Sequence, residues 1–242
     1  MANFYITKDS IKEDKAIITG DEARHISRVL RMKKGDRVTL CDGEGTFYDA
    51  VLSSFEQDSV TADILSSRES ETEPKVQITI YQGIPKNQKL DTIVQKATEV
   101  GVVRIVPVDT ARAVAKIDKA AKIERLNKIA CEAAKQSKRG VALKVEMPLS
   151  FKDAALEASK ADLAIIPYEE ETEVSLKTVL KGNKFTSVSI MIGPEGGFEK
   201  SEVELAKSLG IRSVTLGKRI LRTETAGLCV STAVLYEMDE MQ

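Results

Sequence analysis

Polar and apolar residues alternate in short runs over the first 72 positions of the chain. Four runs have the length of β-strands and are rich in Val, Ile, Thr and Phe: AIITG, DRVTLCDG, TFYDAVLSSF and SVTADILSS. The pairs Asp42-Gly43 and Glu44-Gly45 separate the second run from the third, as in a hairpin loop. This pattern predicts a small β-barrel.

One stretch of this region, DEARHISRVLRM, has helical periodicity instead. Its expected apolar face consists of Ala23, Ile26, Val29 and Leu30, and its expected basic face of Arg24, Arg28 and Arg31. Residues 66–74 are polar and charged and end in proline, which is typical of a linker. We therefore expect two domains, over residues 1–72 and 73–242.

Beyond the linker, apolar runs of strand length alternate with segments of helical periodicity. The expected strands are VQITIYQG, VRIVPVD, DLAIIPY, VSIMIG and SVTLG. The expected helices are QKLDTIVQKATEVG, residues 118–138, KSEVELAKSLG and TAGLCVSTAVLYEM, with Gly101 and Gly210 ending the first and third. This alternation predicts an α/β domain with a mostly parallel sheet covered on both faces.

Composition narrows the function classes. The chain has 242 residues, 42% of them hydrophobic, and a net charge of −1, so it lacks the strongly basic balance that marks many nucleic-acid binders. His25 is its single histidine and its three cysteines form no C-x-x-C pair, which argues against zinc, a disulfide framework and a hydrolytic triad. The polar N-terminal stretch is unlike a signal peptide, and no apolar run has the ~20 residues of a membrane helix. We expect a cytoplasmic protein that binds no metal and no membrane.

Two glycine loops carry the candidate chemistry. IMIGPEGGFEK at residues 190–200 and LGKRILRTETAG at residues 216–227 each follow an apolar strand, so both should open at the carboxyl edge of the sheet. Glycine allows close backbone approach to a ligand, and Ile220 and Leu221 could wall a flat adenine ring. Neither loop has the G-x-G-x-x-G or G-x-x-x-x-G-K-[ST] pattern. Ordinary strand-to-helix turns are the alternative, and spacing alone does not identify a ligand.

These loops also carry a resemblance to a known family. IGPEGGF and LGKRILRTETA, together with HISRVLRMKKGD, KNQKLDTIVQKATEVGV and KIACEAAKQSKRG, resemble the bacterial methyltransferases that modify N3 of one uridine in 16S rRNA, the RsmE family. That family belongs to the knotted SPOUT methyltransferases, and the resemblance spans nearly the whole chain. Lys138 stands where glycine is common in the family. This departure is small and concerns a turn or a substrate contact.

The resemblance implies S-adenosylmethionine as cofactor, a trefoil knot in the C-terminal domain, a PUA-like barrel at the N-terminus and a homodimer. It implies cofactor contacts from Ile192, Gly193, Pro194, Glu195, Gly196, Gly197, Leu216, Gly217, Arg219, Ile220, Leu221 and Thr225. A 16S rRNA or small-subunit substrate would be contacted by Arg24, His25, Arg28, Arg31, Lys86, Lys89, Lys135, Gln136 and Arg139, with Gln136 and Arg139 alternatively facing the partner subunit.

Local clusters of basic residues make RNA binding compatible with a net charge close to zero. Residues 112–144 contain ten basic and three acidic side chains, and residues 21–37 contain six and three. A polarised surface of this kind can bind RNA at zero net charge. Solvated helix faces are the alternative explanation of both charge runs. Aromatic residues make up only 5% of the chain, so we expect phosphate and shape contacts to dominate over base stacking.

The chemistry at uridine N3 requires loss of a proton and leaves negative charge on the base, so the site needs a cation and a proton acceptor. Arg222 is the candidate for the charge because its planar fork suits an oxyanion. Glu195 and Glu224 are the nearest candidate proton acceptors. The alternatives are a structural role, as for Glu224 in the first turn of a helix, and transfer of the proton to solvent.

Two other functions remain open at this point. A SPOUT enzyme could instead methylate a ribose 2′-hydroxyl or a guanine, although no asparagine of the chain begins the N-x-G-x-x-x-R stretch usual in ribose enzymes. The chain could also be a non-catalytic RNA-binding assembly factor that keeps the loops as turns.

Overall fold

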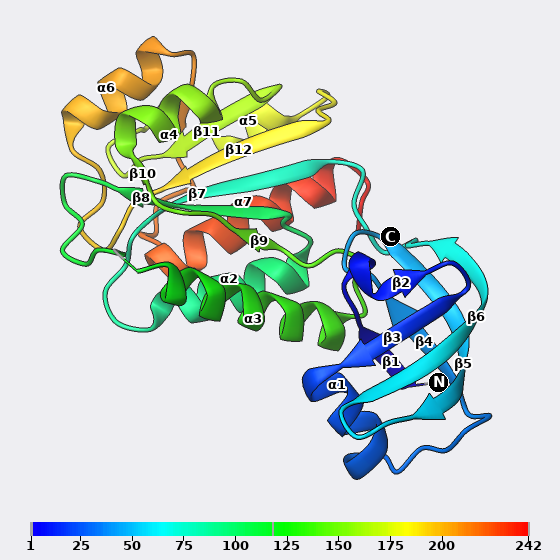
Figure 1. The fold of residues 1–242 in the computed structure, drawn as a ribbon. Helices are drawn as coiled ribbons and strands as arrows, with labels where there is room; N and C mark the ends of the chain where they lie inside the picture. Colours follow the sequence, from blue (N-terminus) through cyan, green and yellow to red (C-terminus); the bar gives the residue numbers. More distant parts are fainter. Residues whose placement is uncertain (1, 118, 242) are drawn as a thin grey trace. The chain divides into compact units, whose positions relative to one another are not determined.

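The computed structural model describes residues 2–117 and 119–241 and divides into two compact units (Figure 1). Unit 1 comprises Met1–Glu73 and Ala134–Ala142, and unit 2 comprises Pro74–Ala133 and Leu143–Gln242. The return of residues 134–142 to unit 1 is a long-range feature that no local sequence pattern indicates. The domain boundary after residue 72 stays a prediction.

Unit 1 is built on a six-stranded sheet in the order β1-β4-β5-β6-β3-β2. Its elements are β1 (Ala2–Tyr5), a 3-10 turn (Lys8–Ser10), β2 (Ile11–Lys12), β3 (Lys15–Thr19), β4 (Arg37–Cys41), β5 (Thr46–Phe55) and β6 (Ser59–Glu69). Its buried core includes Phe4, Leu40 and Leu52. The expected hairpin loop joins β4 to β5, where the Asp42 carboxylate accepts hydrogen bonds from the backbone N–H groups of Glu44 and Thr46 at 2.9 and 3.0 Å.

Two local expectations in unit 1 need correction. The expected helix is α1 (Gly20–Arg24) followed by a π-helical turn (His25–Val29), and only the first half of its predicted apolar face is buried. Val29 and Leu30 are 69% and 45% exposed, because the widened turn shifts them out of register with Ala23 and Ile26. The expected linker begins later than predicted, since β6 continues to Glu69 along the start of β5.

Unit 2 contains a seven-stranded sheet in which each registered strand pair is parallel, which confirms the predicted α/β class. The strand order is β10-β8-β7-β12-β11-β13, with β9 paired to β8. The bounds are β7 (Gln77–Gly83), β8 (Arg104–Asp109), β9 (Lys144–Val145), β10 (Leu149–Ser150), β11 (Leu163–Pro167), β12 (Ser187–Ile192) and β13 (Arg212–Val214). The two-residue strands β9 and β10 were not predicted.

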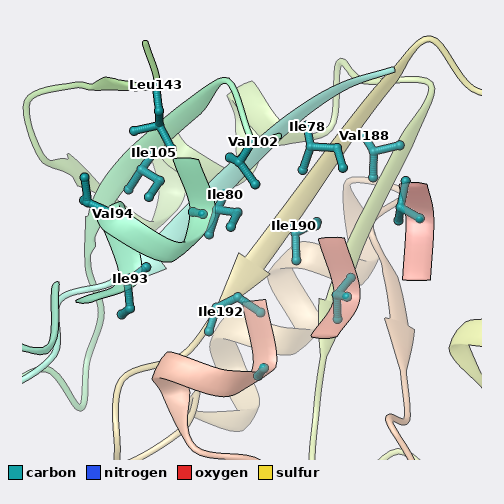
Figure 2. Close-up of a cluster of buried hydrophobic side chains, with 14 of the residues drawn as sticks. Ile78, Ile80, Ile93, Val94, Val102, Ile105, Leu143, Val188, Ile190 and Ile192 are labelled. Carbon is teal, nitrogen blue, oxygen red and sulfur yellow. The ribbon is translucent and has the colours of Figure 1, made fainter. Parts of the chain in front are cut away.

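Helices cover both faces of this sheet (Figure 1). One face packs against α2 (Lys89–Val100), α3 (Ala120–Ser137), α5 (Leu176–Leu180) and α7 (Thr223–Glu237), and the other against α4 (Phe151–Ala158) and α6 (Lys200–Ser208). Figure 2 shows the first core, where Ile78, Ile80 and Ile190 of the central strands meet Ile93 and Val94 of α2. The expected start of α3 at residue 118 lies outside the described residues, and α4 and α5 were not predicted.

Strand order determines which loops meet at the carboxyl edge. Because β12 lies between β7 and β11, and β13 follows β11, the loops after these four parallel strands open on the same edge. None of the described helices is both long and apolar enough to cross a bilayer. The trefoil knot that the resemblance implies stays a prediction.

Candidate functional site

A pocket of about 470 Å³ lies at the carboxyl edge of the unit 2 sheet. Three loops form it, those that follow β11, β12 and β13, together with the first turn of α7. All predicted cofactor contacts line it except Glu195, Gly196 and Thr225: Ile192, Gly193, Pro194, Gly197, Leu216, Gly217, Arg219, Ile220 and Leu221. The two glycine loops thus share one cavity, and their role in holding a cofactor stays a prediction.

The first glycine loop is a tight turn that leaves backbone groups facing the pocket. The N–H of Gly197 donates to the carbonyl of Pro194 at 2.9 Å, and Gly197 has a φ of +67°. A Cβ on Gly193 would lie 3.1 Å from the backbone of Gly197, so the two glycines pack against each other without room for a side chain. In the second loop, Gly217 has a φ of +99° and open space where a side chain would point.

A buried relay joins this turn to the last helix. The Nε2 group of Gln82, at the end of β7, donates to Oγ1 of Thr223 at 2.8 Å, and the Thr223 hydroxyl donates to the carbonyl of Gly193 at 2.6 Å. Thr223 lines the pocket, whereas the predicted Thr225 is exposed and outside the lining. The first helical residue, Thr223, faces inward, whereas Thr225 lies on the other side of the turn, so its placement does not favour the predicted cofactor contact.

Beside the pocket, the three charged residues Lys89, Glu195 and Glu224 form one cluster. The ammonium of Lys89, the first residue of α2, lies 3.0 Å from Oε1 of Glu195 and 3.5 Å from Oε2 of Glu224. The backbone N–H of Lys86 also donates to the Glu195 carboxylate, at 3.2 and 3.3 Å to its two oxygens. Oε2 of Glu224 is buried and has the ion-pair contact but no hydrogen bond within the described part of the chain.

Hydrogen bonding sets the protonation of this cluster. Burial alone raises the pKa of Glu195, but hydrogen bonds from backbone N–H groups and from Lys89 outweigh it and hold that pKa below its ordinary value. The hydrogen bond that the Lys89 ammonium donates to the Glu195 carboxylate raises the pKa of Lys89. Both groups are therefore charged at neutral pH, and Glu195 is a weaker proton acceptor than a free carboxylate.

Two arginines stand at the borders of the site. Arg222 is the N-cap of α7 and is exposed; its carbonyl accepts the N–H groups of Thr225 and Ala226, both at 2.9 Å, while no hydrogen bond of its guanidinium is found among the described residues. Arg112 was not singled out from the sequence, yet its Nη1 donates to the carbonyl of Gly196 at 3.0 Å. The preceding residue, Ala111, is fixed by a 2.9 Å hydrogen bond to Glu202 of α6.

The candidate RNA contacts fall into two groups. Side chains on exposed positions are Arg24, His25, Arg28, Arg31, Lys86 and Gln136, although Arg24 also pairs with Asp21 at 2.6 Å. Lys135 pairs with Glu22 and lies 5.7 Å from the ring centroid of Tyr5. Arg139 is only 3% exposed and pairs with Glu73 at 2.6 Å, so its guanidinium is used inside unit 1 and its placement does not favour the predicted RNA contact.

Sequence reasoning missed one wall of the pocket. The loop after β11 contributes Tyr168, Glu169, Glu171 and Thr172 to the lining. This segment contains no glycine, so the glycine pattern gave no reason to include it. The available signal was positional: DLAIIPY is a predicted buried strand, and whatever follows it must open at the same edge as the glycine loops.

The residues present fit the cofactor that the resemblance implies. The cavity volume lies within the range of ligand pockets, and its walls combine aliphatic side chains with backbone groups at glycines. Ile192, Leu216 and Leu221 provide flat apolar surface for a purine, and Gly193, Gly197 and Gly217 leave the backbone open to polar groups.

Comparison with known proteins identifies relatives over the whole chain. A family model described as an RNA methyltransferase domain matches residues 72–235, and one described as an RNA methyltransferase PUA domain matches residues 18–65. Ribosomal RNA small subunit methyltransferase E of Bacillus subtilis (strain 168) is 36% identical, over 97% of this chain and 95% of its own length.

Two solved structures are similar in both sequence and fold. Ribosomal RNA small subunit methyltransferase E from Neisseria gonorrhoeae, bound to S-adenosyl methionine, is 29% identical with a TM-score of 0.87, over 98% of this chain and 97% of its own. A methyltransferase from Legionella pneumophila in complex with the cofactor SAM is 27% identical with a TM-score of 0.84, over 97% of this chain and 96% of its own.

Proposed function

This chain belongs to the ribosomal RNA small subunit methyltransferase E family, and we propose that it methylates N3 of one uridine in 16S rRNA with S-adenosylmethionine as methyl donor. The observation that carries the proposal is the pocket formed by the loops after β11, β12 and β13, in which both glycine loops take part. The relatives with bound cofactor, 27% and 29% identical, support the choice of donor.

The cofactor supplies an electrophilic methyl group, and the chain's own residues prepare the acceptor. When N3 of uridine loses its proton, negative charge spreads over the two carbonyl oxygens of the base. Arg222 is exposed at the start of α7, beside the pocket residue Thr223, and its guanidinium is free to face that charge. A cation at this position lowers the energy of the anionic base more than that of the neutral one.

The two carboxylates differ in their capacity to accept the N3 proton. Glu195 is ionised and committed to Lys89 and to the backbone of Lys86, so its main role is to hold Lys89 in place. Glu224 has one oxygen with only a 3.5 Å ion-pair contact and no hydrogen bond among the described residues. We propose that Glu224 accepts the proton, directly or through water, and that the N3 edge of uridine faces Glu224 and not Glu195.

Substrate binding is assigned to both units. We propose that residues 1–72 form a PUA-like RNA-binding domain, in which Arg28 and Arg31 contact phosphates, and that residues 73–242 form the methyltransferase domain. The family match of residues 18–65 to an RNA methyltransferase PUA domain supports this division. We also propose a cytoplasmic location, which the ribosomal RNA substrate named for the relatives supports.

The decisive experiment is a nucleoside digest analysed by mass spectrometry. Small ribosomal subunits that lack the modification are incubated with the protein and isotopically labelled S-adenosylmethionine. We expect label in 3-methyluridine at one position of 16S rRNA. Label in a 2′-O-methylated nucleoside or a methylguanosine would overturn the assigned atom, and binding of RNA without any labelled nucleoside would favour the assembly factor.

We also propose that two copies of the chain associate. The apolar residues Ile220 and Tyr236, in the second glycine loop and on α7, are 89% and 74% exposed, and Cys229 of the same helix is exposed as well. Stable homodimers commonly bury exposed apolar side chains of this kind against a second copy. Sedimentation equilibrium should give twice the 26.5 kDa mass of the chain, and a mass that stays at 26.5 kDa at micromolar concentration would contradict the proposal.

A further inference from the structure

Two acidic side chains of the pocket, Glu169 and Glu171, have no role in the mechanism above. We propose that Glu169 provides the negative charge that contacts a positively charged group of the cofactor. This inference rests on the proposed function, because it assumes that the pocket of the glycine loops holds S-adenosylmethionine. It concerns the loop after β11, which sequence motifs did not indicate.

Glu169 is positioned directly over the first glycine loop. Its two carboxylate oxygens lie 2.9 and 3.0 Å from the point where a Cβ on Gly197 would stand. Gly197 therefore satisfies two demands, a left-handed φ of +67° and the absence of a side chain where the carboxylate lies. The charge is thereby held against the loop that forms the pocket wall, and both residues line the cavity.

The carboxylate of Glu169 is uncommitted, unlike that of its neighbour in the lining. Glu171 accepts hydrogen bonds from the backbone N–H groups of Glu173 and Val174 and pairs with Lys207 at 3.3 Å. These contacts, led by the N–H of Glu173, lower the pKa of Glu171 to about 2. Glu169 has no hydrogen bond or ion pair to the described residues, so its charge is available to a ligand.

The charges of the pocket match those of the cofactor. S-adenosylmethionine carries a carboxylate, an ammonium and a sulfonium, which leaves one positive charge in excess. Lys218 and Arg219 line the same pocket and suit the carboxylate of the ligand, whereas Glu169 suits a cation. Both the sulfonium and the ammonium have the required chemistry, and the ligand series below separates them.

Calorimetry with three ligands tests the proposal without measuring turnover. The parent protein and Glu169→Gln are titrated with S-adenosylmethionine, with S-adenosylhomocysteine, which lacks the sulfonium charge, and with methylthioadenosine, which lacks both cations. Glutamine keeps the shape over Gly197, and circular dichroism verifies folding. Glu173→Gln serves as the control, since it removes the same charge from an exposed position of the same loop that is outside the lining.

We expect Glu169→Gln to weaken S-adenosylmethionine about five- to tenfold, because the pair is charge-assisted yet partly screened by solvent. An unchanged affinity for S-adenosylhomocysteine identifies the sulfonium as the partner. Equal losses for these two ligands, with none for methylthioadenosine, identify the ammonium. Equal losses for all three ligands would indicate that the Glu169 carboxylate contacts the ribose, which overturns the proposal. Parental affinity of Glu169→Gln for S-adenosylmethionine would overturn it as well. If the parent itself binds none of the ligands, the proposed function fails instead.

Discussion

At the scale of single residues, Gly217 and Gly182 allow a matched test of the pocket. Both adopt a positive φ, +99° and +72°, and neither has an atom within 4 Å of the position where a Cβ would stand. Replacement by alanine therefore imposes backbone strain of about 1–2 kcal/mol at each site without a steric clash. Only Gly217 lines the pocket.

We expect Gly217→Ala and Gly182→Ala to lower the melting temperature by similar amounts. Only Gly217→Ala should weaken the binding of S-adenosylmethionine in calorimetry, because the strained loop no longer presents its backbone to the ligand. If both variants bind the cofactor like the parent, the second glycine loop is a turn without a binding role.

Arg222 is the residue on which the assignment of the chemistry depends. Loss of one fixed donor to a developing oxyanion typically costs ~10²–10³ in rate, so Arg222→Ala should reduce single-turnover methylation by about that factor at saturating S-adenosylmethionine. Arg222→Lys should recover part of the rate, because an ammonium supplies the charge without the planar fork. The affinity for the cofactor should change little.

Arg212→Ala is the control for Arg222, since Arg212 is an exposed arginine of β13 outside the pocket lining. Its rate should equal that of the parent. A loss of cofactor affinity in Arg222→Ala that parallels the loss of rate would reassign the arginine to holding the second glycine loop.

At the scale of elements, a polar cluster fixes α4 to the sheet. The hydroxyl of Tyr81 on β7 lies 3.0 Å from the Glu157 carboxylate of α4 and 3.0 Å from Nη2 of Arg104 on β8. Burial, opposed by Arg104 and reinforced by Glu157, raises the pKa of Tyr81 to about 12, from an ordinary value of 10. The folded state therefore retains the phenolic proton to higher pH than the unfolded state does.

This linkage predicts an alkaline loss of stability. The contribution of Tyr81 is fully present below pH 10 and disappears as the pH rises from 10 towards 12, because only the unfolded state then loses the proton. Tyr81→Phe should cost about 1–2 kcal/mol at pH 8 in urea unfolding, and the difference from the parent should shrink above pH 10. A difference in unfolding free energy between Tyr81→Phe and the parent that stays constant with pH would contradict this prediction.

The same elements show what the sequence could predict. Helices α2 and α7 follow from apolar spacing, and the five longer parallel strands from buried runs bounded by turns. Helix α4 was not predicted because its buried face is rich in alanine and contrasts only weakly in hydrophobicity with its exposed face. That buried face consists of Phe151, Ala154, Ala155 and Ala158. β6 extends into the expected linker, where Arg68 lies over the ring of its strand partner Phe47, a cross-strand contact that a local pattern does not contain.

For the site, local pattern located the two glycine loops but not their neighbours. Strand order, which no local pattern contains, places β12 between β7 and β11 and so brings Lys89 and Glu169 to the same loop from different elements. Half-buried acidic partners such as Glu73 also determine which basic residues are available to RNA. Composition could not distinguish the paired Arg139 from the exposed Arg28.

At the scale of the whole molecule, a net charge of −1 must be reconciled with binding to a polyanion. Affinity for RNA then depends on cations that are exposed and unpaired, and not on the overall sum. In unit 1, Arg28 and Arg31 are exposed and have no ion pair to the described residues, whereas Lys135 and Arg139 are paired with Glu22 and Glu73. The counterions released on binding should therefore be traceable to individual exposed residues such as Arg28 and Arg31.

The salt dependence of binding measures that number. In filter-binding titrations with 16S rRNA at several salt concentrations, Arg28→Gln and Arg31→Gln should each reduce the slope of log K against log salt by about one. Lys15→Gln removes an equal charge from an exposed position of β3 and should leave the slope unchanged if contact, and not general attraction, is responsible. Arg139→Gln should instead destabilise the fold, because it leaves the Glu73 carboxylate without its guanidinium partner. Equal slopes for Arg28→Gln, Arg31→Gln and the parent would show that this basic face is solvated and that the RNA is held elsewhere.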